Sequence, residues 1–329
     1  MGYSNTLHPD RYHGFTKKPP YFEGWYYKLV SADEKTRFAI IPGVYLSKEP
    51  EKNHCFIQVF DSNADAVRYH RYPYREFQAA RESFNVQVGG STFSRDAISL
   101  DIDDEFGKLQ GSLNFTGLNP WPVSVFSPGA MGWFAWVPFM ECYHGVVSMD
   151  HRIDGRLVMD GEDLDFSGGR GYIEKDWGRQ FPSAWIWGQS NHFESPGVSL
   201  MLSVAVIPWI GRSFGGFIIG LLHDGVLHRF ATYNRGRIET LSINDAEVDL
   251  VVKNATHRLH VKAIRVEGGL FQAPTTTEMD RRIIETLDAK LNVRLEDLSG
   301  GEIFSGTGQY AGLETVGDLD QLIRMVQKG

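Results

Sequence analysis

The sequence predicts a mainly β protein built from two antiparallel barrels or sandwiches in tandem, with one or two helices late in the chain. Short apolar runs with period-2 alternation recur along the 329 residues and are bounded by turn residues. The chain is also rich in glycine (35 residues) and in aromatic residues (13%), which suit tight turns and pleated surfaces. Strands do not alternate with helical patterns, so a parallel sheet is not expected.

The predicted strands follow these runs in order. In the first half they cover residues 38–41, 55–60, 84–88, 98–102, 109–115 and 146–149. In the second half they cover residues 198–206, 217–222, 226–233, 248–252 and 259–266. Asp224-Gly225 predicts a type I′ hairpin turn, because both residues tolerate positive φ. Similar turn signals are Gly89-Gly90, Asp154-Gly155 and Asp160-Gly161.

Two helices are expected late in the chain. Residues 275–291 begin with a possible capping box, Thr275 with Glu278, and carry a helical stripe made of Ile283, Ile284, Leu287 and Leu291. A second stripe consists of Val316, Leu319, Leu322, Ile323 and Val326. We interpret the second stripe as a terminal helix packed on the body of the protein, with a partner-binding helix as the alternative.

The two halves of the chain resemble each other weakly. Trp25-Tyr26-Tyr27 precedes an apolar run that ends in Ile41-Pro42, and Trp185-Ile186-Trp187 precedes one that ends in Ile207-Pro208. We therefore expect two domains, 1–165 and 166–329, joined near residues 155–172.

Composition excludes several classes of protein. The net charge of −8 and the lack of a basic run argue against nucleic-acid binding. Two cysteines are too few for a disulfide scaffold, and the N-terminus carries no signal-peptide pattern. No apolar stretch reaches the roughly 20 residues of a membrane span. These features lead us to expect a cytoplasmic protein; the oligomeric state stays open.

Acids and tryptophans are concentrated in one short span. Residues 171–178 read GYIEKDWG, and residues 185–191 read WIWGQSN. In an extended segment Tyr172, Glu174 and Asp176 share one face, while Lys175 points to the other. Apolar walls raise the pKa of a carboxyl group, so Glu174 or Asp176 could act as a general acid beside the Tyr172 phenol. The alternative is a solvated strand end whose acids pair with Lys175 and Arg179.

Two further segments repeat the theme. Residues 22–28 read FEGWYYK, and alternation places Glu23 and Trp25 on one face; a structural first strand is the alternative to a catalytic role. Residues 120–145 are rich in aromatics, proline and glycine, which excludes a long helix. We interpret them as an apolar loop over a pocket mouth or at a membrane surface, with plain core as the alternative. Glu141 and His144 could form an acid/base pair there.

Metal and nucleotide sites are not predicted. His257 and His260 lack the HExxH, CxxC or carboxylate surroundings of a metal site. The glycines of residues 306–312 have the wrong spacing for a dinucleotide-binding loop.

Several motifs together carry a resemblance. FEGWYYK (22–28), PFMECYHG (138–145), YIEKDWG (172–178), WIWGQSN (185–191) and AGLE (311–314) resemble the tocopherol cyclase family. More distantly, Tyr172-Ile173-Glu174 followed by Trp177-Gly178 is similar to a segment of carotenoid hydratases. The resemblance implies two lipocalin-like antiparallel β-barrels and a reaction without a cofactor.

The chemistry that the resemblance implies is acid-initiated. In tocopherol cyclases a tail double bond of a prenylated benzoquinol is protonated, and the phenolic oxygen closes onto the cation to give a chromanol. In the hydratases water captures the cation. A hydrophobic small molecule is therefore the expected partner, and peripheral contact with a membrane is a further expectation.

Site residues follow from the matched positions. Glu174 matches the hydratase acid and is the first choice of proton donor, Asp176 is the second, and Tyr172 orients or relays. The expected substrate-binding residues are Trp25, Glu23, Glu141, His144, Trp177, Trp185, Trp187, Gln189 and Asn191. Among these, Glu23 and Glu141 are reserve acids, and Gln189 with Asn191 would hold the quinol oxygens. Two alternatives stay open, a non-catalytic binder of an isoprenoid or lipid and an isoprenoid hydratase; carbohydrate binding has little support.

Overall fold

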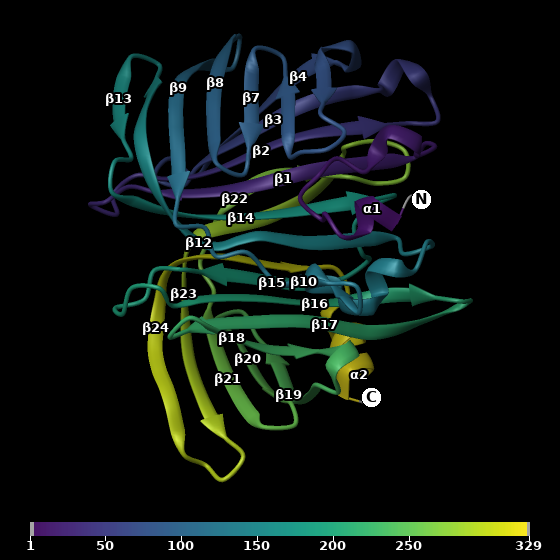
Figure 1. Cartoon of the computed structure of the whole chain (residues 1–329), viewed down its shortest axis with the longest axis vertical. Helices are drawn as coiled ribbons and strands as arrows, with labels where there is room; N and C mark the ends of the chain where they lie inside the picture. The colour runs from purple at the N-terminus through teal and green to yellow at the C-terminus, as the bar shows by residue number, and fades with distance from the viewer. Residues whose placement is uncertain (1–2, 328–329) are drawn as a thin grey trace. The chain divides into compact units, whose positions relative to one another are not determined.

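The computed structural model describes residues 3–327, and the chain divides into two compact units (Figure 1). Unit 1 comprises Met1–Phe181 and Gly269–Arg282, and unit 2 comprises Pro182–Gly268 and Ile283–Gly329. The first boundary lies after Phe181, whereas the sequence analysis places it at residue 165. The segment between these positions stays in unit 1 because its strand, Gly169–Gly178, pairs with two strands of that unit.

Unit 1 contains a large antiparallel sheet with the strand order β4-β3-β2-β1-β14-β12-β9-β8-β7-β6-β5, and β13 pairs with β12. Its strands are β1 Tyr21–Val30, β2 Arg37–Leu46, β3 His54–Asp61, β4 Ala66–Pro73, β5 Phe77–Ala79, β6 Asn85–Val88, β7 Ser91–Ser94, β8 Ala97–Asp104, β9 Gly107–Thr116, β12 Cys142–Met159, β13 Glu162–Asp165 and β14 Gly169–Gly178. Because β1, β14 and β12 are central, each is hydrogen-bonded on both sides.

Shorter elements complete unit 1. They are α1 Tyr3–Thr6, the 3₁₀ turns η1 Gly14–Thr16, η2 Pro50–Lys52, η3 Tyr74–Glu76 and η4 Gly129–Trp136, the hairpin β10 Val123–Ser124 with β11 Ser127–Pro128, and β22 Gly269–Ala273. The Gln58 side-chain amide exchanges two hydrogen bonds of 2.9 Å with the backbone of Gln272, which attaches β22 to β3.

Unit 2 contains a second antiparallel sheet with the order β18-β17-β16-β15-β24-β23-β21-β20-β19. Its elements are β15 Trp185–Ser190, β16 Ser199–Trp209, β17 Arg212–His223, β18 Val226–Ala231, η5 Thr232–Asn234, β19 Arg237–Ile243, β20 Glu247–Lys253, β21 His257–Ile264, β23 Arg281–Asp297, β24 Glu302–Val316 and α2 Leu319–Gln327. Among the described residues, neither of the two strand orders returns to its first strand.

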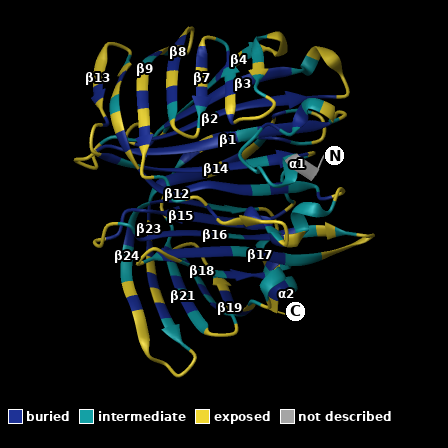
Figure 2. Ribbon diagram, viewed as in Figure 1, coloured by how far each residue is buried: buried dark blue, intermediate teal, exposed yellow. Residues whose placement is uncertain are grey.

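Each unit has its own hydrophobic core. In unit 1 the ring of Tyr27 contacts those of Phe84, Phe93 and Phe115. In unit 2 the core is a continuous aliphatic cluster that includes Ile186. Along β8 and β9, exposed residues alternate with buried ones, and Figure 2 shows them as yellow and blue bands. This alternation is the physical basis of the period-2 signal in the sequence.

The predicted strands are confirmed, since each of the runs overlaps a strand of the structure. Asp224-Gly225 forms the β17–β18 turn with φ values of 49° and 71°, as predicted. The prediction of a turn at Asp154-Gly155 is wrong, because both residues lie inside β12. Glycine is needed there for another reason: a Cβ on Gly155 would lie 2.3 Å from the carbonyl oxygen of Ser112 on β9.

The prediction of a helix over residues 275–291 is wrong. Residues from Arg281 onward form β23, where Ile283, Leu287 and Leu291 are buried with the other odd-numbered positions between 283 and 295, whereas Ile284 is exposed. The apparent helical stripe is thus part of a period-2 pattern. Thr275 still accepts a hydrogen bond from the backbone N–H of Glu278, in a turn and not at a helix start.

The predicted C-terminal helix is confirmed as α2, whose Leu322 and Val326 join the core of unit 2. None of the helices within residues 3–327 is long and apolar enough to cross a membrane.

Candidate active site

The candidate site lies on the central strands of unit 1. The register places His144 of β12 opposite Asp176 of β14, and Val146 opposite Glu174. Because alternate residues of a strand point to opposite faces, Tyr172, Glu174, Asp176 and His144 share one face of the sheet. The sequence analysis predicts this arrangement for the three β14 residues but does not place His144 among them.

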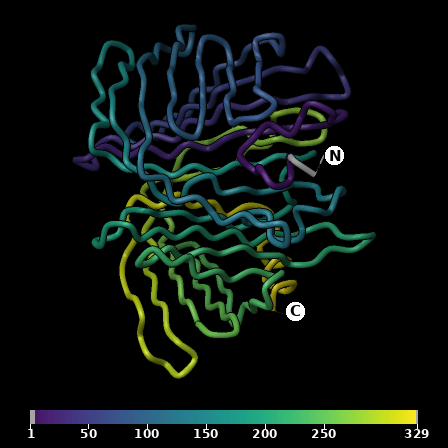
Figure 3. Tube along the Cα trace, in the orientation of Figure 1, coloured from purple at the N-terminus to yellow at the C-terminus, as the bar shows by residue number. Residues whose placement is uncertain are grey.

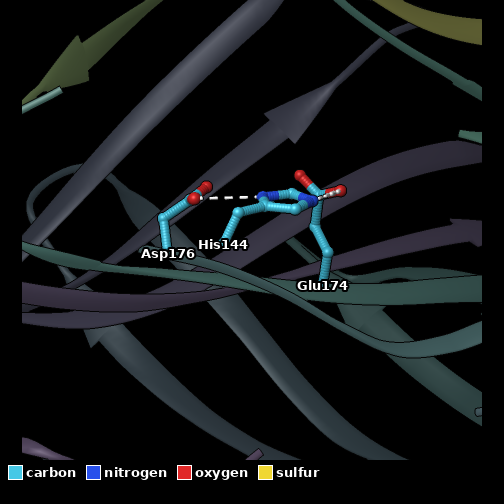
Figure 4. Close-up of side chains that lie close together, drawn as sticks. All are labelled: His144, Glu174 and Asp176. Carbon is cyan, nitrogen blue, oxygen red and sulfur yellow. Dashed lines mark hydrogen bonds and ion pairs between the residues drawn. The ribbon is translucent and has the colours of Figure 1, made fainter. Parts of the chain in front are cut away.

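These four side chains form a continuous polar chain. The Tyr172 hydroxyl donates a hydrogen bond of 2.6 Å to Glu174 Oε2. His144 Nε2 lies 3.6 Å from the same oxygen, and His144 Nδ1 lies 3.0 Å from Asp176 Oδ1. Figure 4 shows the imidazole ring between the two carboxyl groups. His144 is therefore hydrogen-bonded to Asp176, whereas its Nε2 lies near Glu174 without a hydrogen bond to it.

Burial and neighbouring charges determine the pKa values of the residues in this site. Glu174 is only 5% exposed, whereas the Asp176 side chain keeps 27% of its surface in solvent. Burial alone would lower the pKa of His144, but the charges of Asp176 and Glu174 raise it to about 9. Burial, together with the charge of Glu174, raises the pKa of Tyr172 well above its ordinary value. As long as both carboxyl groups are ionised, His144 is therefore an imidazolium at neutral pH, and Tyr172 is a neutral phenol.

We expect the stability of the protein to depend on pH through His144. The pKa rises from 6.5 in the unfolded chain to about 9 in the fold, so the stabilisation is complete below pH 6.5. It is lost as the pH rises through 9, and it amounts to at most about 3 kcal/mol. Denaturant unfolding of the wild type and of His144→Asn below pH 6.5 and above pH 9 measures this difference. The same pH dependence in both proteins would contradict the prediction.

The opposite face of the same strands carries a second buried cluster. The register places Glu23 of β1 opposite Trp177, and Trp25 opposite Lys175. Lys175 forms an ion pair with Glu23 and donates hydrogen bonds to the carbonyl oxygen of Arg11 and, over 2.9 Å, to His13 Nδ1. Glu23 also accepts hydrogen bonds from Tyr21 and from the backbone N–H of His13. Both charged side chains are completely buried.

The neighbouring charges determine whether Glu23 and His13 are protonated. Burial favours the neutral form of Glu23, but the charge of Lys175 and the contacts with His13 lower its pKa below the ordinary value. Burial and Lys175 lower the pKa of His13, which is therefore neutral and donates from Nε2 to the carbonyl oxygen of Asn5. Glu23 is thus a paired carboxylate and cannot serve as a proton donor at neutral pH.

The N-terminal segment is attached to the sheet by this cluster (Figure 3). Trp25 donates from its indole nitrogen to the carbonyl oxygen of Asp10, and the His13 ring stacks on Trp177 at 4.4 Å. The rings of Trp25 and Trp177 each lie 4.8 Å from Lys175 Nζ, a cation–π arrangement. These two tryptophans therefore lie on the face opposite Glu174 and do not surround its carboxyl group.

Glu141 lies just before β12, outside both clusters. Its carboxylate accepts a hydrogen bond of 2.6 Å from Gln180, and its backbone oxygen accepts one from the N–H of Arg179. The acid/base pair expected between Glu141 and His144 is not formed, because His144 contacts Asp176 and Glu174 instead.

The remaining predicted residues belong to unit 2. Trp185, Trp187 and Gln189 alternate with Ile186 along β15, so they lie on the face opposite the core of that unit, and Asn191 follows the strand. All four side chains are buried. The Trp185 indole donates to Glu314 of the neighbouring strand β24.

Sequence reasoning missed Lys175 and His13 as members of a buried network. The available signal was the period of β14, in which Lys175 shares one face with the apolar residues Ile173 and Trp177. A lysine at an inward position requires a buried counter-charge. The identity of that partner, Glu23, depends on the pairing of β1 with β14.

Three residues of this site also offer ligand atoms for a cation. One atom each from His144, Glu174 and Asp176 lies within 4.8 Å of the others, a spacing that a divalent ion could bridge. However, His144 Nδ1 is occupied by Asp176, so an ion would have to use Nε2 or displace that contact.

Comparisons with known proteins agree with the sequence resemblance. The model of a family described as tocopherol cyclase-like matches residues 117–317. This range includes His144, Tyr172, Glu174 and Asp176. A chloroplastic tocopherol cyclase of Zea mays is 28% identical over 151 residues, which cover 44% of this chain. The match spans 31% of the maize protein, about a third of its length.

Solved structures share the fold. The crystal structure of CghA with Sch210972 superimposes with a TM-score of 0.56 at 13% identity, covering 91% of this chain and 89% of CghA. Kievitone hydratase from Nectria haematococca gives a TM-score of 0.50 at 10% identity, covering 95% of each chain. At such identities the likeness shows the fold alone. It confirms the predicted lipocalin-like two-barrel class, although neither sheet is closed in the described part of this chain.

Proposed function

This chain belongs to the tocopherol cyclase-like family, and on that premise we propose that it cyclises a prenylated benzoquinol to a chromanol. Glu174 donates a proton to a tail double bond and leaves a tertiary carbocation. The phenolic oxygen then bonds to this carbon and releases its own proton, which restores the acid. One proton is given and one is returned, so the reaction is an isomerisation that needs no redox cofactor.

The observation that carries the proposal is the burial of Glu174 between Tyr172 and His144. For this step Glu174 is protonated when the substrate is bound, while the Asp176 carboxylate, the larger of the two charges that raise the pKa of His144, keeps the imidazole charged. After the alkene takes the proton, Glu174 is a carboxylate, and the His144 imidazolium 3.6 Å away stabilises it. The Tyr172 hydroxyl donates a hydrogen bond to Oε2 of Glu174. Asp176 is half-buried and contacts Nδ1 of the His144 imidazolium. Its role is therefore to position His144.

Shielding from water supports a cyclase more than a hydratase. The Glu174 and His144 side chains are both almost completely removed from solvent. A carbocation formed beside them would meet few water molecules, which favours capture by an oxygen of the same substrate.

One cavity in the core of unit 2 is too small to hold a carried ligand. The cavity lined by Ile186, Leu202, Leu250 and Val261, among others, has a volume of about 10 Å³. This is about the space for one water molecule, whereas pockets for small organic ligands measure roughly 300 to 1,000 Å³.

Incubation with a prenylated benzoquinol in D₂O tests the proposal. We expect a chromanol that carries one carbon-bound deuterium, detected by mass spectrometry and NMR, with turnover unaffected by a metal chelator. A product heavier by one water molecule would instead establish a hydratase. Substrate that binds, quenches tryptophan fluorescence and is recovered unchanged would establish a binder. Heat-denatured protein is the control for uncatalysed cyclisation.

A further inference from the structure

An uncharged segment precedes the strand that carries His144. None of the residues 117–140 is charged, although 22% of the whole chain is. The segment contains the β10–β11 hairpin and η4 and leads directly into β12. The sequence analysis leaves open whether it is core, a pocket cover or a membrane contact.

The structure shows that much of this segment is not core. Phe126 at the hairpin tip is 90% exposed, and Phe139 is 54% exposed. Val123, Val125 and Trp133 are exposed as well, and we call these five residues the hairpin surface. The Trp136 indole donates a hydrogen bond of 2.9 Å to the carbonyl oxygen of Val125, which fixes the tip against η4. The apolar side chains are therefore held outward.

Positive charges lie near residues 137–143, where the uncharged segment joins β12. Lys17 Nζ is 5.9 Å from the ring of Tyr143, whose hydroxyl donates to the carbonyl oxygen of Val137. Lys18 follows and is exposed, and the exposed Arg179 is hydrogen-bonded through its backbone to Glu141. These three basic residues belong to a chain with a net charge of −8, and the carboxylate of Glu141 lies beside Arg179. Such basic residues complement anionic lipid head groups.

We propose that the hairpin surface inserts into the interface of a lipid bilayer that contains anionic lipids. Aromatic and aliphatic side chains beside lysine and arginine are the composition of interfacial membrane contacts. The segment itself carries no charge, so the electrostatic attraction to anionic lipids comes from the neighbouring basic residues. The proposal is independent of the proposed reaction, although a membrane would bring a lipid-soluble substrate close to β12.

Vesicle flotation with the full chain tests this proposal without any substrate. We expect binding to vesicles of phosphatidylcholine with phosphatidylglycerol. The double variant Val125→Ser, Phe126→Ser should lower the partition coefficient at least about tenfold, because two exposed apolar side chains no longer enter the lipid. Phe106→Ser is the matched control: Phe106 is 52% exposed at the distant β8–β9 turn, and its replacement should change nothing.

The basic residues have their own test. Lys18→Gln and Arg179→Gln should each weaken binding to the anionic vesicles about fivefold and leave binding to pure phosphatidylcholine unchanged. Circular dichroism and thermal melting verify that all variants are folded.

Three results would overturn the proposal. They are no flotation with vesicles of either composition, equal flotation of the hairpin variant and the wild type, and a lipid-free dimer that the hairpin variant abolishes. The last result would identify the hairpin surface as a contact between two copies of the chain. A failure of the cyclisation assay would affect none of these measurements.

Discussion

Glu174→Gln is expected to reduce turnover of the prenylated quinol about 10³- to 10⁴-fold, the upper range for loss of a general acid. Glutamine keeps the volume of the side chain and an oxygen that accepts the hydrogen bond from Tyr172. It cannot release a proton to an alkene. Substrate binding, measured by tryptophan fluorescence, should stay within about threefold, because the change leaves the apolar surroundings intact.

Asp176→Asn is the matched control for Glu174→Gln. Asp176 is hydrogen-bonded to His144 at Nδ1 and acts through it, so its loss should lower turnover only about tenfold. It should also lower the pKa of His144, which NMR titration detects. A larger loss of turnover in Asp176→Asn than in Glu174→Gln would assign the proton donor to Asp176. Near wild-type activity of folded Glu174→Gln would refute the mechanism.

Lys175→Met should destabilise the protein by about 3 to 5 kcal/mol, the usual cost of removing one partner of a buried ion pair. The change leaves the buried Glu23 carboxylate without its counter-charge, and it removes the hydrogen bond to the carbonyl oxygen of Arg11. Denaturant unfolding monitored by circular dichroism measures the effect.

The double variant Glu23→Leu, Lys175→Met should recover much of this loss, because it contains no buried charge. Lys35→Met is the surface control: Lys35 is 83% exposed in its pair with Asp33, so a change within about 0.5 kcal/mol is expected. A Lys175→Met protein as stable as the wild type would show that Glu23 is not held as a carboxylate.

The two faces of β14 explain why similar motifs have different roles. Glu23 and Glu174 are both buried acids close in sequence to tryptophan. Glu23 lies beside a lysine and is kept ionised, whereas Glu174 lies among a phenol, an imidazolium and a second carboxyl group. Both acids therefore have a tyrosine and a histidine as neighbours, and the buried charge of Lys175 is what keeps Glu23 ionised.

Much of the fold and part of the candidate site could be predicted from the sequence. The strands, the Asp224-Gly225 turn and α2 follow from local patterns, and so does the shared face of Tyr172, Glu174 and Asp176. The helix wrongly predicted over residues 275–291 shows the limit of local patterns: four apolar positions fit a helix, and only the burial of the whole of β23 reveals a period of two.

The sequence by itself determined that the acids of residues 172–176 point to one face and Lys175 to the other, because the face of a strand residue depends only on spacing. Only the tertiary structure decided that Glu174 meets His144 and that Lys175 meets Glu23. Those contacts depend on the register of β14 with β12 and with β1. Register is set by pairing between segments far apart in the chain, and local alternation carries no information about it.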